Sequence, residues 1–197
     1  MDGKKYPVIT IAREYCAYGR TVAAALSKRM GIDYYDRDIV NQTIIESEFS
    51  ESESTVSMNN VEEFLEDMLG SVAAYSSSFD RIFEAQRNVI LNMAQEPCIL
   101  VGRCANAILK EAGIESFNVF LYADRDKRMV RCAELNPDMD EEQREDRLRR
   151  VDEDRQILYK SFGKTNMYDM HNYDICIDVG TLGVEKTVET ILALVTA

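Results

Sequence analysis

Residues 14–21 of the chain, with the sequence EYCAYGRT, have residue types and spacing that could bind phosphate. A phosphate-binding loop has the pattern GxxxxGK[ST], because glycines let backbone N–H groups wrap the phosphates while the lysine reaches the outer ones. Gly19 and Thr21 match this pattern, Arg20 stands in place of the lysine, and Glu14 replaces the first glycine. On its own this match is poor, because a Gly-Arg-Thr at a helix start is more often a coincidence.

A second candidate feature is the concentration of positive charge in residues 125–164, which hold 11 Lys+Arg and 11 Asp+Glu. The whole chain has 23 basic and 35 acidic residues, a net charge of −12, and it has no Lys or Arg between Arg37 and Arg81. Two interpretations stay open. The stretch could be a solvated helix with ion pairs along its surface, or a mobile cationic cover for an anionic ligand.

Composition excludes several classes of protein. The net charge of −12 and a pI near 4.6 argue against nucleic-acid binding through phosphate charge. No apolar run reaches the ~20 residues of a membrane-spanning helix, and the first residues show no signal-peptide pattern. The five cysteines never form CxxC and there is one histidine, His171. We therefore expect reduced thiols in a cytoplasmic protein, with no zinc site and no membrane partner.

The elements that must position these residues follow from hydrophobic patterning. Short apolar runs predict strands, and amphipathic stretches between them predict helices, as in a parallel α/β sheet with right-handed crossovers. The expected strands are 8–12, 32–36, 98–101, 117–123 and 175–178. Segment 38–95 lacks a strand and is expected to be a helical insertion beside the sheet. Ligands in such folds bind at the carboxyl ends of the strands, which directs attention to the loop after the first one.

Six strings along the chain together resemble the cytidylate kinase-like family of P-loop nucleoside monophosphate kinases. Residues 12–20 look like a variant of that family's first loop, which typically reads Ser-Arg-Glu-Phe-Gly-Ser-Gly-Gly-Arg. Asp152 and Arg155 match the Asp-x-x-Arg of its lid. The six strings, which cover nearly the whole chain in the family's order, are 12–20, 32–37, 98–105, 117–131, 152–155 and 172–178.

The resemblance implies a single domain over 1–197 with a three-layer α/β/α P-loop NTPase fold and a central parallel sheet of about five strands. Segment 38–95 would be the helical acceptor-binding insertion, and 136–166 the arginine-rich helical lid. The implied activity is phosphoryl transfer from ATP, with Mg²⁺, to a nucleoside monophosphate of the cytidylate type or a similar small acceptor. The oligomeric state stays open, a homodimer included, because the apolar helix faces in 58–95 could pair between chains.

The resemblance also implies roles for single residues. Arg20 would contact the outer phosphates of ATP, and Thr21 is a candidate Mg²⁺ ligand. The remaining roles fall into three groups. The phosphate cradle would be Ala17, Tyr18 and Gly19; the acceptor site would include Asp36, Arg37, Gly102 and Arg103; and the cations closing over the transferring phosphate would be Arg149, Arg150 and Arg155, one of them held by Asp152. Arg128 and Arg131 are expected to be structural.

The chain departs from the family at its site. Cys16 and Tyr18 stand where the family usually has glycines, so any position with φ > 0 there costs about 1 kcal/mol or more, and a tyrosine ring could obstruct the phosphate path. Val101 and Cys104 replace two aspartates of the cytidylate kinases, which puts cytidine specificity in doubt. These departures support an alternative: a non-catalytic kinase-fold protein that binds nucleotide or a protein partner.

Overall fold

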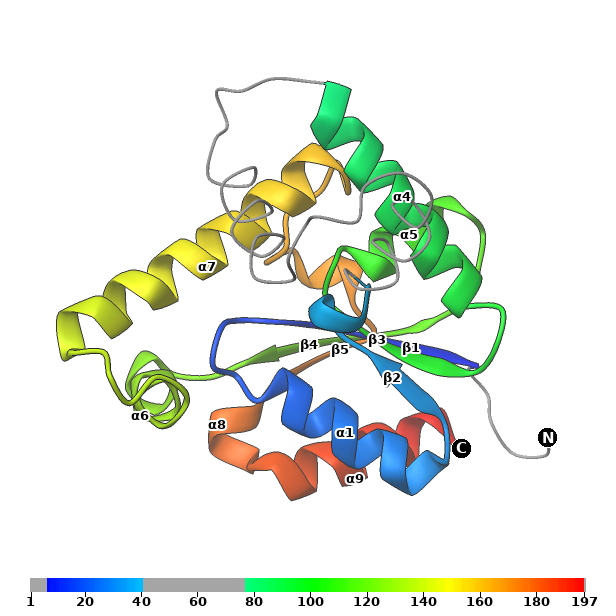
Figure 1. The fold of residues 1–197 in the computed structure, drawn as a ribbon. Coiled ribbons are helices and arrows are strands. Elements are labelled where there is room, and N and C mark those ends of the chain that lie inside the picture. The colour runs from blue at the N-terminus through cyan, green and yellow to red at the C-terminus, as the bar shows by residue number, and fades with distance from the viewer. Residues whose placement is uncertain (1–6, 41–76, 197) are drawn as a thin grey trace, which may run out of the picture.

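The computed structural model describes residues 7–40 and 77–196, and a five-stranded parallel sheet is at its centre (Figure 1). The order of the strands across the sheet is β2-β3-β1-β4-β5. Their bounds are Val8–Arg13 for β1, Asp33–Tyr35 for β2, Cys98–Val101 for β3, Phe117–Tyr122 for β4 and Ile175–Asp178 for β5. The prediction of a central parallel sheet of about five strands is confirmed.

Strand β1 lies in the middle because its residues suit burial on both faces. The run from Val8 to Ala12 is apolar apart from Thr10, and all five residues are buried. Thr10 satisfies its hydroxyl by donating to the side-chain carbonyl of Asn118 on β4 at 2.8 Å. The site at the end of β1 is therefore built on a rigid central strand.

Helices cover both faces of the sheet (Figure 1). On one face lie α1 (Gly19–Met30), α8 (Val179–Leu182) and α9 (Val184–Val195), and buried residues of α1 and α9 share the largest apolar cluster with the strands. On the other face lie α4 (Ser77–Met93), α5 (Ala105–Glu111) and α7 (Glu141–Ser161). Helix α6 (Arg125–Leu135) follows β4 and packs against α7, and a 3-10 turn covers Met170–Asn172.

Element boundaries differ from the sequence prediction at several points: β1 extends one residue further, to Arg13, and β4 ends one residue earlier, at Tyr122. The second strand is shorter, with pairing limited to Asp33–Tyr35. The last strand is followed directly by the short helix α8, whose start is capped because the carboxylate of Asp178 accepts the N–H of Thr181 at 3.0 Å. Most of the expected insertion, residues 41–76, lies outside the described residues. In the described part of the chain, no helix is long and apolar enough to cross a membrane.

Candidate phosphate site at the carboxyl edge of the sheet

The loop of residues 14–18 connects β1 to α1 in a tight turn. The N–H of Ala17 donates to the carbonyl of Glu14 at 3.3 Å, and α1 begins at Gly19. Cys16 and Tyr18 adopt φ values of 62° and 56°, so both are in the left-handed region that usually selects glycine. No side chain caps the amino-terminal end of α1 and no acid lies in its first turn. Its unpaired N–H groups are thus suited to an anion.

A buried carboxylate, that of Asp152 on α7, attaches this loop to two helices. Oδ1 accepts the backbone N–H of Tyr15 at 2.6 Å, and Oδ2 accepts Nη1 of Arg128 on α6 at 2.5 Å. The same arginine lies 3.5 Å from Glu14, whose carboxylate also accepts the N–H of Ala123. The side chains of Asp152 and Arg128 are only 10% and 14% exposed, so this is a buried charge network.

Arg155 approaches the loop from the same face of α7. Its Nη1 donates to the backbone carbonyl of Arg13 at 3.0 Å and lies 3.5 Å from Asp152. Burial lowers the pKa of Arg155, the charge of Asp152 opposes that shift, and the charge of Arg37 adds to it. Arg155 and Asp152, two of the predicted lid residues, are thus brought to the loop, and Arg128 has the structural position expected of it.

Arg149 and Arg150, the other two predicted lid cations, lie elsewhere on α7. Their side chains are 60% and 64% exposed, and they pair with carboxylates of their own helix, Arg149 with Asp146 and Glu153, and Arg150 with Asp146. The structure does not bring them to the loop. For these two residues, the solvated ion-pair interpretation of the cationic stretch describes the structure.

The side chains that replace the family's glycines are accommodated by packing against the core and against α6. The ring of Tyr18 packs on the main apolar cluster, with the Arg131 guanidinium 4.9 Å from its centroid. Cys16 is buried and shares a small apolar cluster with Cys132 of α6. Burial, together with Cys132, raises the pKa of the Cys16 thiol to about 12, which makes it an inert thiol. All five cysteines are free of disulfides.

Arg20, expected to reach the outer phosphates, is engaged by two carboxylates at the end of β2. Its Nε lies 2.7 Å from Asp36, and its Nη2 binds Asp38. The other oxygen of Asp36 accepts the N–H groups of Asp38 and Ile39 at 3.0 and 3.3 Å, so it caps the helical turn that begins at residue 37. Asp36 therefore joins the first turn of α1 to the start of the predicted acceptor segment.

Gly102 and Arg103, both predicted to belong to the acceptor site, follow β3 directly. Arg103 and Cys104 have φ values of 57° and 55°, a second pair of non-glycine residues in the left-handed region at this edge. Burial and then the charge of Arg37 lower the pKa of Arg103 to about 10. Arg103 and Arg37, both predicted to bind the acceptor, are therefore close enough for their charges to repel.

Sequence reasoning missed Arg13, the last residue of β1. Burial and then the charges of Arg155, Arg20 and Arg103 lower its pKa well below the usual range, so the side chain lies among three other cations. The signal in the sequence that could have identified it is an arginine at the carboxyl end of a buried apolar run, where ligands bind in such folds. An edge with this charge suits an anion that carries several oxygens.

Magnesium ligands are few at this edge. Thr21 is exposed in the first turn of α1. The carboxylates of Asp36 and Asp38, which follow β2, are paired to Arg20. No group of three or more His, Cys, Asp or Glu residues that could hold a metal occurs among residues 7–40 and 77–196. This fits Mg²⁺ bound mainly through nucleotide phosphates, with at most one or two protein ligands.

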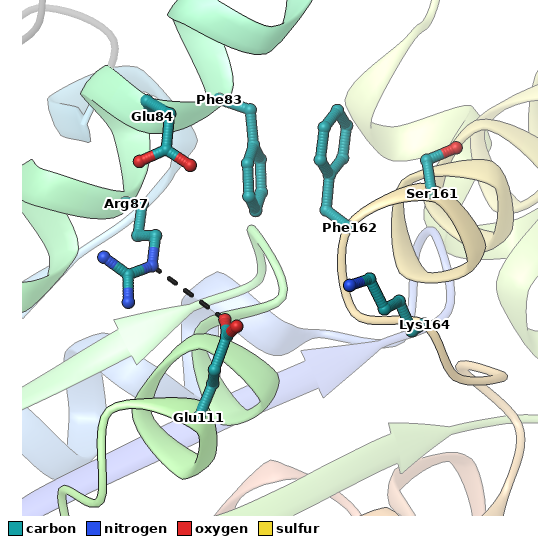
Figure 2. Close-up of a pocket in the computed structure, with 7 residues that line it drawn as sticks. All are labelled: Phe83, Glu84, Arg87, Glu111, Ser161, Phe162 and Lys164. Atoms are coloured by element: carbon teal, nitrogen blue, oxygen red, sulfur yellow. Dashed lines mark ion pairs between the residues drawn. The ribbon is translucent and has the colours of Figure 1, made fainter.

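A separate pocket of about 420 Å³ lies between α4, α5 and the end of α7. Figure 2 shows the Phe83 and Phe162 rings next to each other in its lining and Arg87 pointing to Glu111. The two rings are stacked, with their centroids 3.7 Å apart. None of the predicted site residues lines this pocket.

Comparison with known proteins identifies the class to which this fold and site belong. The five-stranded parallel sheet with helices on both faces is the fold of P-loop kinases. The family model of the cytidylate kinase-like family matches residues 8–181, and the chain belongs to that family. The family and the fold indicate nucleotide-dependent phosphoryl transfer. No protein of curated function gives a significant match.

Three solved structures illustrate the likeness. An uncharacterized protein from Eubacterium ventriosum is 21% identical over 95% of this chain and 97% of its own, with a TM-score of 0.71. Shikimate kinase from Bacteroides thetaiotaomicron is 14% identical over 95% and 96%, with a TM-score of 0.57. The YorR protein of Bacillus subtilis, solved with phosphorylated GDP, is 16% identical over 95% of both chains, with a TM-score of 0.52. At these identities the likeness concerns the fold.

The buried network predicts a large loss of stability on removal of its central charge. Asp152→Asn keeps the size of the side chain but leaves the Arg128 guanidinium without its closest anion. We expect the free energy of unfolding, measured by urea denaturation, to fall by about 3 kcal/mol. Glu153→Gln, next in sequence but exposed, is the control and should change it by less than about 0.5 kcal/mol. Equal losses in the two variants would contradict the network.

The raised pKa of Glu14 predicts a specific pH dependence of the protein's stability. Burial raises the pKa of Glu14, outweighing the charge of Arg128, so the folded protein keeps this proton at pH values at which the unfolded chain, with a pKa near 4.5, has lost it. The contribution of Glu14 is therefore most favourable below that value and is lost as pH rises through the folded pKa. Glu14→Gln should gain stability relative to wild type as pH rises from 4.5 to 7, measured by urea denaturation. Parallel profiles would disprove this.

Proposed function

We propose that the protein transfers the terminal phosphoryl group of ATP to a nucleoside monophosphate of the cytidylate type or to a similar small acceptor. The observation that carries the proposal is the convergence of five cations at the carboxyl edge of the sheet: Arg13, Arg20, Arg37, Arg103 and Arg155. Arg13 lies against Gly19 and Gly102, Arg155 donates to the carbonyl of Arg13, and neighbouring cations of this set lower the pKa of Arg13, Arg103 and Arg155. Phosphoryl transfer needs little covalent chemistry from the protein, because positioning and positive charge stabilise its transition state.

The proposed roles follow from position. The uncapped start of α1, with Ala17, Tyr18 and Gly19, would bind the phosphates of ATP through backbone N–H groups. Thr21 would bind the Mg²⁺ that accompanies them. Arg103, at the end of β3, would bind the phosphate of the acceptor together with Arg37.

The proposal also assigns roles to residues of the predicted lid. Asp152 positions Arg155, which is held against the end of β1. The roles of Arg149 and Arg150 as lid cations stay predictions. To reach the transferring phosphate, both side chains would have to leave their carboxylate partners on α7. The whole acceptor lobe, 38–95, stays a prediction as well.

A second function is favoured by a specific observation: the cation of the loop motif, Arg20, is already neutralised by Asp36 and Asp38. A protein whose loop no longer engages ATP productively would bind nucleotide, or a protein partner, without turnover. The two functions differ in one measurable respect, the acceptor-dependent release of ADP.

The test measures ATP·Mg²⁺ binding by calorimetry and ADP release with CMP, dCMP and shikimate as acceptors. We expect micromolar ATP binding and turnover with at least one of them. Arg103→Met should lower kcat/KM for the acceptor roughly 100-fold and leave ATP affinity unchanged. Arg29→Met, which removes an exposed cation in the last turn of α1, is the control. A folded wild type that binds ATP without turnover on any acceptor would support the second function instead.

A further inference from the structure

The side chain of Arg13 fills a space that two glycines leave open. A Cβ on Gly19, the first residue of α1, would lie 2.8 Å from Cγ of Arg13. A Cβ on Gly102, just after β3, would collide with Nη1 of the same side chain. Arg13 therefore runs from the phosphate loop, where its aliphatic part lies against Gly19, to the acceptor side, where its guanidinium lies against Gly102.

The surroundings of Arg13 are cationic and contain no counter-ion. Arg155, Arg20 and Arg103 all lie close enough to oppose its charge. Within residues 7–40 and 77–196, no carboxylate forms an ion pair with Arg13 and its guanidinium donates no hydrogen bond. Its polar neighbour Tyr159 is buried and directs its own hydroxyl to Asn106 at 2.8 Å. A guanidinium with these neighbours gains both hydrogen-bond acceptors and a counter-charge when an anion binds.

Arg20 has the opposite environment. Its side chain is 54% exposed, and its guanidinium already binds the carboxylates of Asp36 and Asp38. A phosphate that bound the same edge of this guanidinium would have to displace both carboxylates, which would leave the largely buried Asp36 without this partner. Of the two arginines that flank the loop, Arg20 has its charge offset by two carboxylates, whereas no carboxylate of the described residues forms an ion pair with Arg13.

We propose that Arg13, rather than Arg20, is the principal phosphate-binding cation of this site, and that it contacts the phosphoryl group in transfer between the loop and Gly102. This inference rests on the proposed function. In the transfer, an oxygen of the acceptor forms a bond to the γ-phosphorus of ATP while the bond from that phosphorus to the β–γ bridging oxygen breaks, and ADP leaves with the electron pair. Arg13 gives up no proton. It binds non-bridging oxygens through two N–H groups, which a planar guanidinium does well.

The same reasoning gives Arg20 a positioning role. By holding Asp36, it orients the carboxylate that caps the turn beginning at residue 37, and so it connects α1 to the acceptor segment. Its removal should therefore weaken the use of the acceptor more than the binding of phosphate.

The test compares Arg13→Met with Arg20→Met by calorimetry, using ATP·Mg²⁺ and inorganic pyrophosphate as probes. We expect Arg13→Met to weaken binding of both probes by roughly 100-fold, and Arg20→Met by less than about five-fold. Arg13→Lys, which keeps the charge but not the two-pronged geometry, should lie between wild type and Arg13→Met. Arg29→Met, at an exposed arginine in the last turn of α1, is the matched control and should bind like wild type.

Thermal unfolding without ligand separates binding from a structural role. Because Arg13 is surrounded by cations, Arg13→Met should melt at the same temperature as wild type or higher, and should lose the rise in Tm that pyrophosphate gives wild type. A lower ligand-free Tm with full pyrophosphate affinity would overturn the proposal, since Arg13 would then be structural.

The outcomes also distinguish this inference from the proposed function. If Arg20→Met loses ATP and pyrophosphate binding while Arg13→Met and Arg13→Lys keep it, the assignment of Arg13 is wrong and the kinase proposal stands. If the folded wild type binds neither probe, both are wrong.

Discussion

The site depends on one buried carboxylate, that of Asp152. The loop of residues 14–18 contains two non-glycine residues with positive φ, each costing about 1 kcal/mol, so its backbone would not hold this shape unaided. Asp152 accepts the N–H of Tyr15 and the guanidinium of Arg128 at once, and lies beside Arg155. One charge therefore fixes the loop against α6 and α7. Burying it is tolerable only because every partner is present.

That constraint explains how an acidic chain builds a cationic edge. The charges in the second half of the chain are sorted by their position on α7. Arg149, Arg150 and Glu153 face solvent and neutralise one another on the helix, whereas Asp152 and Arg155 point to the loop. With Asp152 occupied by Arg128 and Tyr15, it only partly offsets Arg155, and positive charge accumulates where the strands end. The net charge of −12 is that of the whole chain, whereas the local charge at this edge is positive.

Much of the fold could be predicted from the sequence, because buried parallel strands need uncharged β-branched runs and helices need amphipathic spacing. The site could be predicted only in part. Residues 148, 152, 155 and 159 recur at helical spacing, with Leu148, Asp152 and Tyr159 buried, and this pattern separates Asp152 and Arg155 from Arg149 and Arg150. Because the sequence-based prediction grouped the arginines of α7 by residue type alone, it missed that distinction. The pairing of Arg20 with Asp36 depends on the contact between α1 and β2, which no local pattern specifies.

A motif assigns a role to a position, while the neighbours of a side chain decide whether it can perform that role. In the loop pattern, the residue after the second glycine supplies the cation, and here that residue is Arg20. Two carboxylates at the end of β2 already form ion pairs with it. The space beside Gly19 and Gly102 is filled by the side chain of Arg13, which comes from β1. When a second cation reaches the same place from a neighbouring strand, the motif cation can instead join α1 to the turn that begins at residue 37, as Arg20 does through Asp36. The substitutions in this loop are therefore consistent with a phosphate site whose cation has moved by seven residues, from 20 to 13, as well as with one that has been lost.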